Sequence, residues 1–333
     1  MPELELNADL VLEGGGVKGI ALVGAYSVIE EQGYTIKRIA GTSAGSIVGA
    51  LLAAGLKADE LEAMLRKLDY RRFRDESLLG RLPLVGKPLD VMFRQGIYKG
   101  NYAHDWIRDR LAEHSVHTFA DLPYVDAART IPENERYKLV VMVSDISRGV
   151  LLRLPWGYPD YDQKADDQPV ADAVRASMSI PFFFKPVRLK NLGSGRDSVL
   201  VDGGMLSNFP VETFDAPARV EPRWPTFGIM LSAKAGSAED AAPNDVHGTI
   251  SMSRAMLETM MGFYDRMYVD RPDVQARTIF VDTGAIRSTD FGLTPDDRTF
   301  LYESGRQAAK DFFKTWDWEK YKAEHRTPAS GGS

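Results

Sequence analysis

The 333-residue sequence contains no cysteine. A chain without thiols has no disulfides, no thiol nucleophile and no thiolate metal site, and this criterion leaves the cellular compartment open. An excess of basic charge is also absent, because 41 Lys and Arg residues face 47 Asp and Glu residues and the formal net charge is -6. This acidic balance argues against a protein that binds nucleic acid over a broad surface.

A long hydrophobic run is missing as well. The longest strongly apolar stretch covers residues 44–56, far short of the roughly 20 residues that a membrane-spanning helix needs. The first ten residues, MPELELNADL, are acidic and lack the basic and apolar regions of a signal peptide. We therefore expect a cytoplasmic protein with no transmembrane segment, whose contact with a membrane would be peripheral.

Short apolar runs alternate with helix-length segments from the start of the chain. Residues 9–13 and 36–40 have the composition of buried strands. Residues 17–32 and 44–54 have apolar side chains at helical spacing. This βαβα order predicts a three-layer α/β/α fold around a central, mostly parallel sheet. Further strands are predicted over 138–146, 150–154, 199–201, 227–231 and 278–281, and late helices over 246–267 and 295–316.

No repeat or break in composition divides the chain, which predicts one domain over residues 8–320 and a disordered polar tail over 327–333. The segment 66–100 differs most from the rest of this domain. It has nine Lys or Arg residues against four Asp or Glu residues, with leucines between them. Such a segment either contacts an anionic lipid surface or caps an acyl pocket. The alternative, at about equal weight, is a solvated helix and a loop that packs on the core.

Two glycine clusters follow the first two predicted strands. The first, GGGVKG, contains Gly14, Gly16 and Gly19 in the spacing of a dinucleotide-binding loop. That function also needs an acidic residue at the end of the second strand, where this chain has AGTSAG. The missing acidic residue argues against dinucleotide binding. A P-loop is excluded because no G-K-[ST] follows the glycines.

The second cluster, GTSAG, predicts a nucleophile elbow. It places Ser43 between a predicted strand and a predicted helix, and small residues permit the sharp turn that lifts a serine above a sheet. The residues of this turn are Gly41, Thr42, Ser43, Ala44 and Gly45. The alternative is a glycine-rich turn that contains a serine by chance.

An elbow serine needs backbone N–H donors where an oxyanion forms. A glycine run that enters a helix N-terminus supplies uncovered amides and a favourable dipole. We therefore expect the first cluster to form an oxyanion hole; its residues are Gly14, Gly15, Gly16, Lys18 and Gly19. The Lys18 side chain either adds positive charge there or covers the helix surface.

The serine also needs a base. SVLVDGG predicts a strand that ends at Asp202, followed by Gly203 and Gly204. His247 is the other candidate, because Ser43, Asp202 and His247 stand in the chain order of an α/β-hydrolase triad. Only two strands fit before Ser43, and nothing in NDVHGT fixes an imidazole, so a Ser43–Asp202 dyad is the more economical hypothesis.

GGGVKG, GTSAG and DGG, together with ASMSIPFFFKP at 176–186, resemble the patatin-like phospholipases over residues 8–232. The resemblance implies a lipid acyl hydrolase without metal or cofactor, in which Ser43 attacks a fatty-acyl ester of a phospholipid and Asp202 is its base. Many relatives have arginine where this chain has Lys18, and DGA is an alternative to DGG.

Two other functions stay open at this point. One is a carboxylesterase or neutral-lipid lipase with a Ser43–Asp202–His247 triad. The other is a non-catalytic lipid-binding protein on the same fold. The sequence predicts neither the lipid head group nor the oligomeric state.

Overall fold

The computed structural model describes residues 6–75, 98–126, 130–217, 220–231, 252 and 269–326. These residues form an eight-stranded sheet in the order β5-β6-β3-β2-β1-β7-β8, and β4 pairs with β3 outside this order. The strands are β1 (Leu6–Leu12), β2 (Tyr34–Thr42), β3 (Leu139–Asp145), β4 (Val150–Leu154), β5 (Val187–Lys190), β6 (Asp197–Asp202), β7 (Thr226–Met230) and β8 (Thr278–Phe280).

The centre of the sheet is parallel. β8, β7, β1, β2 and β3 pair in parallel with one another in turn, whereas β4, β5 and β6 add antiparallel pairings at the β3 side. The predicted fold class, a mostly parallel sheet flanked by helices, is confirmed.

The helices begin and end at residues that the sequence explains in part. α9 starts after Thr294, whose side chain accepts a hydrogen bond from Asp297 N–H, and has Pro295 at its first turn. The α-helices are α1 (Gly19–Glu31), α2 (Ala44–Ala53), α3 (Ala58–Lys67), α5 (Asn101–Ala112), α6 (Val170–Ser177), α8 (Pro272–Gln275), α9 (Pro295–Phe313) and α10 (Trp318–His325). Short 3-10 helices lie at Gly16–Lys18, Tyr70–Phe73, Phe119–Asp121, Glu133–Glu135, Tyr158–Tyr161 and Gly203–Met205.

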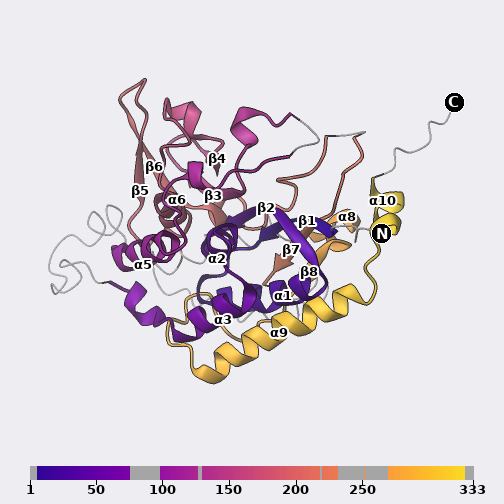
Figure 1. Ribbon diagram of the computed structural model, residues 1–333. Coiled ribbons are helices and arrows are strands. Elements are labelled where there is room, and N and C mark those ends of the chain that lie inside the picture. The colour runs from indigo at the N-terminus through magenta and orange to yellow at the C-terminus, as the bar shows by residue number, and fades with distance from the viewer. Residues whose placement is uncertain are drawn as a thin grey trace.

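Most of the helices cover one face of the sheet. Leu10 and Leu12 of β1 point into this larger core, which includes apolar residues of α1, α2, α3, α6 and α9. α1 is buried along almost its whole length because α9 and α3 pack on the side that faces away from the sheet; Figure 1 shows α9, in yellow, running alongside both. A helix covered on all sides is expected to be apolar all round, as α1 is.

The other face of the sheet has a thinner cover. Val11 of β1 points into a smaller core with Phe209 and Phe214, from the segment after β6, and with Val274 of α8. The two helical layers are therefore unequal. Among the described residues, no helix is both long enough and apolar enough to span a membrane.

Three predicted segments lie wholly or mostly outside the described residues. They are the helix over 246–267, most of the basic segment 66–100, of which only 66–75 and 98–100 are described, and the tail over 327–333.

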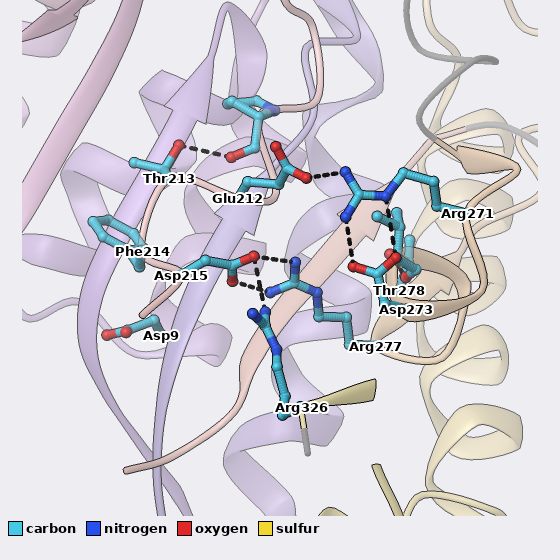
Figure 2. A network of polar contacts seen from close by, with 12 residues as sticks. Asp9, Glu212, Thr213, Phe214, Asp215, Arg271, Asp273, Arg277, Thr278 and Arg326 are labelled. Carbon is cyan, nitrogen blue, oxygen red and sulfur yellow. Dashed lines mark hydrogen bonds and ion pairs between the residues drawn. The ribbon is translucent and has the colours of Figure 1, made fainter. Parts of the chain in front are cut away.

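An ion network ties the C-terminal helix to this second face. Figure 2 shows the guanidinium groups of Arg277 and Arg326 both directed at the carboxylate of Asp215. Arg277 is only 1% exposed. Burial acts to raise the pKa of Asp215, but the two arginines outweigh it and hold the pKa below its usual value. The network thus joins the segment after β6 to the start of β8 and the end of α10.

Replacement of Arg277 tests this network. Arg277→Ala leaves Asp215 with Arg326 as its remaining partner and empties a buried site, so we expect the free energy of unfolding to fall by about 3 kcal/mol in urea titrations. Arg108→Ala is the matched control, because Arg108 is 53% exposed and pairs with aspartates of its own helix; its unfolding midpoint should hardly change. Equal midpoints for the two variants would contradict a structural role for the network.

Candidate active site

Ser43 occupies a strained turn between β2 and α2. Its backbone has φ 49° and ψ -119°, a region that costs a non-glycine residue about 1–3 kcal/mol unless its surroundings impose it. Two serines supply that restraint. Ser43 N–H donates a 2.9 Å hydrogen bond to Ser177 Oγ, and Ser177 donates onward to Met142 O. Ser46 Oγ donates to the Ser43 carbonyl at 2.6 Å.

The small residues of the elbow allow α2 to approach the sheet closely. Gly41 and Thr42 end β2, and Ala44 and Gly45 begin α2. A Cβ atom on Gly45 would lie 2.4 Å from the carbonyl oxygen of Leu12, the last residue of β1. Only glycine fits there, so the serine is held at the sheet edge by direct contact between the helix backbone and β1.

The first glycine cluster runs directly beside this serine. A Cβ atom on Gly14 would lie 3.2 Å from Ser43 Cβ and 2.2 Å from Asn208 Oδ1. The Gly14 N–H donates to Asn208 O. In the described part of the chain, no acceptor receives the N–H of Gly15 or Gly16. Two amides of the loop beside Ser43 therefore have no acceptor among the described residues.

Lys18 and Gly19 continue this loop into α1. Lys18 lies in the 3-10 helix Gly16–Lys18, and Gly19 is the first residue of α1. The Lys18 ammonium donates to Thr283 Oγ1 at 3.1 Å and to Leu231 O at 3.5 Å. Burial lowers its pKa, and the carboxylates of Glu13 and Asp290 act in the opposite direction. The side chain thus holds the glycine loop to the segments after β7 and β8.

The register of the sheet brings Asp202 to the same level as Ser43. Thr42 of β2 pairs with Met142 of β3. The next residue of β3, Val143, pairs with Asp202 of β6. Asp202 ends β6, as the sequence predicts, and β6 runs antiparallel to β3. The two residues meet because β6 ends at the level where β2 also ends.

Asp202 is a buried carboxyl group, and one of its two oxygens has no hydrogen-bond partner among the described residues. It is 1% exposed. Oδ1 accepts a 2.8 Å hydrogen bond from Gly204 N–H, whereas Oδ2 is buried and has no hydrogen-bond partner among the described residues. Burial raises the pKa of Asp202 to about 6, and the Ser43 side chain and the Gly204 amide act in the opposite direction. The Ser43 hydroxyl therefore lies near enough to influence the carboxyl without a full hydrogen bond to Oδ2.

An apolar cavity opens next to Ser43. None of the described residues that line it is charged, so it offers apolar contact to a ligand that reaches the serine. The lining residues are Gly16, Val17, Gly19, Ser43, Ala44, Ile47, Val48, Leu65, Leu68, Tyr70, Phe73, Met178, Ile180, Phe184, Ser288 and Phe291.

The structure thus brings Ser43, the first glycine cluster and Asp202 together, with Gly203 and Gly204 directly after Asp202 in the 3-10 helix Gly203–Met205. His247 lies outside the described residues. Sequence reasoning did not single out Ser177 or Asn208. Ser177 belongs to the block 176–186 that carries the family resemblance, but Asn208, six residues after Asp202, gave no local signal.

Comparisons with known proteins agree with this arrangement of motifs. Residues 10–215 match the family model for patatin-like phospholipases. The chain is 34% identical over 311 residues to the uncharacterized protein YqhO of Bacillus subtilis, a match that covers 93% of this chain and 99% of that relative. It is 24% identical over 278 residues to lysophospholipase NTE1 of Cryptococcus neoformans, covering 82% of this chain but only 14% of the much longer relative.

A solved structure is similar in fold. The crystal structure of VipD from Legionella pneumophila aligns with a TM-score of 0.52 and 18% identity, over 94% of this chain and 67% of that chain. At that identity the likeness concerns the fold alone. The family match, by contrast, includes all three motifs around Ser43, and the chain belongs to the patatin-like phospholipase family.

Proposed function

We propose that this protein hydrolyses fatty-acyl esters of phospholipids, as a phospholipase A or lysophospholipase, through a Ser43–Asp202 dyad. The observation that carries the proposal is the buried, unpartnered Oδ2 of Asp202 at the level of a strained elbow serine. The family of the chain supports a lipid acyl hydrolase in general terms. The apolar lining of the cavity beside Ser43 matches the chemistry of a fatty-acyl chain.

In the first step, the Ser43 hydroxyl oxygen attacks the ester carbonyl carbon and its proton passes to Asp202 Oδ2. A carboxyl with a pKa of about 6 is a stronger base than an exposed aspartate and is still ionised at neutral pH. The proton then goes to the leaving alcohol, and the acyl group stays on Ser43 as an ester. Asp202 next accepts a proton from water, which attacks this ester; the fatty acid leaves, and Asp202 returns the proton to the Ser43 oxygen.

The negative charge on the carbonyl oxygen needs donors during both steps. Of the loop residues, Gly15 and Gly16 are our assigned donors, because the Gly14 N–H is bonded to Asn208 O and the Lys18 N–H to Gly15 O. Removal of one such donor typically lowers kcat by a factor of about 100–1,000. The glycine loop therefore provides much of the lowering of the activation barrier that a carboxylate base alone would not provide.

Three substitutions distinguish the dyad from the alternatives. We expect Ser43→Ala and Asp202→Asn each to abolish hydrolysis of lysophosphatidylcholine, measured as fatty-acid release, while His247→Ala keeps activity within about twofold, since the dyad does not use it. A folded but inactive His247→Ala protein would replace the dyad with a triad. Wild-type protein that binds the lipid without releasing fatty acid would favour a lipid-binding protein.

Contact with a membrane is part of the same proposal. Arg71, Arg72 and Arg74 are exposed, and in the described part of the chain none forms an ion pair with a carboxylate. They lie on or next to the 3-10 helix that also gives Tyr70 and Phe73 to the cavity wall. In an acidic protein, three neighbouring cations that form no ion pair with a described carboxylate, beside an apolar cavity, suit an anionic lipid surface.

Charge reversal tests this contact. We expect Arg71→Glu/Arg72→Glu to bind vesicles of phosphatidylcholine and phosphatidylserine at least about tenfold more weakly than wild type in sedimentation assays, because each basic residue near an anionic surface contributes about 1 kcal/mol. Wild-type binding should also fall as salt is added. The control is Arg108→Glu/Arg110→Glu, on α5, where both arginines already pair with acidic residues. Binding that ignores salt, or equal loss in both variants, would contradict the proposed surface.

A further inference from the structure

Asn208 forms two hydrogen bonds with the glycine loop and a third with Glu13, the residue before the loop. Its Nδ2 donates to Gly14 O at 3.2 Å and to Glu13 Oε1 at 3.1 Å. Its own carbonyl accepts the Gly14 N–H at 3.3 Å. Both backbone polar groups of Gly14 are therefore bonded to one residue, and a Cβ atom on Gly14 would collide with Oδ1 of the same side chain at 2.2 Å.

The orientation of this carboxamide follows from its partners. A carboxylate and a backbone carbonyl are both acceptors, so only the NH2 group can face Glu13 and Gly14 together. Glu13 is itself fixed, since it is 5% exposed and its other oxygen accepts the Leu231 N–H. The end of β7 thus holds Glu13, and Glu13 orients Asn208.

The same residue joins the two loops on either side of the candidate site. Asn208 follows Asp202 on the segment that begins with Gly203, and Thr42 Oγ1 donates to Ser207 O at 3.3 Å. Gly14 lies against Ser43. A shift of Gly14 would displace the amides that follow it, and an oxyanion hole works only when its donors lie about 2.7–3.1 Å from the oxygen.

We propose that Asn208 is a positioning residue that, oriented by Glu13, holds the glycine loop so that the amides of Gly15 and Gly16 face the oxyanion. This inference rests on the proposed function. It predicts that Asn208 affects transition-state stabilisation rather than substrate binding, because the acyl cavity does not include it.

The test exchanges the donor for an acceptor of the same size. Asn208→Asp places a carboxylate against Glu13 and the Gly14 carbonyl, and we expect kcat for lysophosphatidylcholine to fall about 100-fold with KM within about threefold of wild type. In Glu13→Gln/Asn208→Asp, the side-chain amide at position 13 can donate to the carboxylate at position 208. This variant should have a kcat at least about tenfold above that of Asn208→Asp.

Two further variants test whether misfolding or the introduced charge alone explains a loss of kcat. Asn208→Ser cannot reach both acceptors but brings no repulsion, so it should fold and still lose at least about tenfold in kcat. Asn191→Asp is the matched control, a half-buried asparagine whose Nδ2 also donates to a backbone carbonyl, that of Asp160; its kinetics should equal those of wild type. Circular dichroism checks the fold of each variant.

The outcomes separate this inference from the proposed function. Folded Asn208→Asp and Asn208→Ser proteins with wild-type kcat would overturn the inference and leave the dyad intact. If Asn208→Asp lowers kcat and Glu13→Gln/Asn208→Asp does not restore it, Asn208 is a structural residue and its proposed coupling to Glu13 is wrong. Wild-type protein without esterase activity would overturn the proposed function and the inference together.

Discussion

The candidate site depends on one close contact, that between the first turn of α2 and the end of β1. The Leu12 carbonyl sits where a side chain at position 45 would begin, so the helix backbone rests on the strand. This contact keeps the turn that carries Ser43 against the sheet, and hydrogen bonds with Ser177 and Ser46 restrain Ser43 at φ 49°. The contact also positions the glycine loop, because Gly14 follows Leu12 by only two residues and lies so near Ser43 that a Cβ atom on Gly14 would come within 3.2 Å of Ser43 Cβ. The proposed nucleophile and the amides proposed to stabilise the oxyanion are therefore positioned by the same piece of backbone packing.

The buried carboxylates differ in whether they have partners that stabilise their negative charge. Asp215 has two arginines, and its pKa is held below the usual value. Glu13 is likewise fixed, by a backbone amide and by Asn208. Asp202 is buried to a similar degree but has only one amide on Oδ1, and burial raises its pKa to about 6. A carboxylate kept desolvated and without a counter-charge destabilises the fold, which is characteristic of groups retained for chemistry.

Much of this arrangement could be predicted from local sequence, and the remainder depends on tertiary register. GGGVKG and GTSAG each end a strand and begin a helix, so their place at one edge of a parallel sheet follows from the βαβ order. The direction of β6 could not be predicted, because a strand sequence encodes burial and not orientation; Asp202 reaches Ser43 through an antiparallel pairing with β3. Ser177 and Asn208 act through hydrogen bonds across more than 130 residues, and no spacing rule reveals such contacts. The hydrogen bonds of Lys18 to Thr283 and Leu231 could not be predicted either, because both partners lie more than 200 residues away in the sequence.

The claim that Ser43 is a nucleophile activated by Asp202 is tested most directly by a fluorophosphonate probe, in which the serine oxygen displaces fluoride from phosphorus. Intact-protein and peptide mass spectrometry would follow the rate of labelling as a function of pH. We expect one adduct per chain, on Ser43, at a rate that falls as the pH drops through about 6 and Asp202 is protonated. Asp202→Asn should not label at a comparable rate at any pH. An adduct on another residue, or labelling of Ser43 that is indifferent to Asp202, would contradict the account.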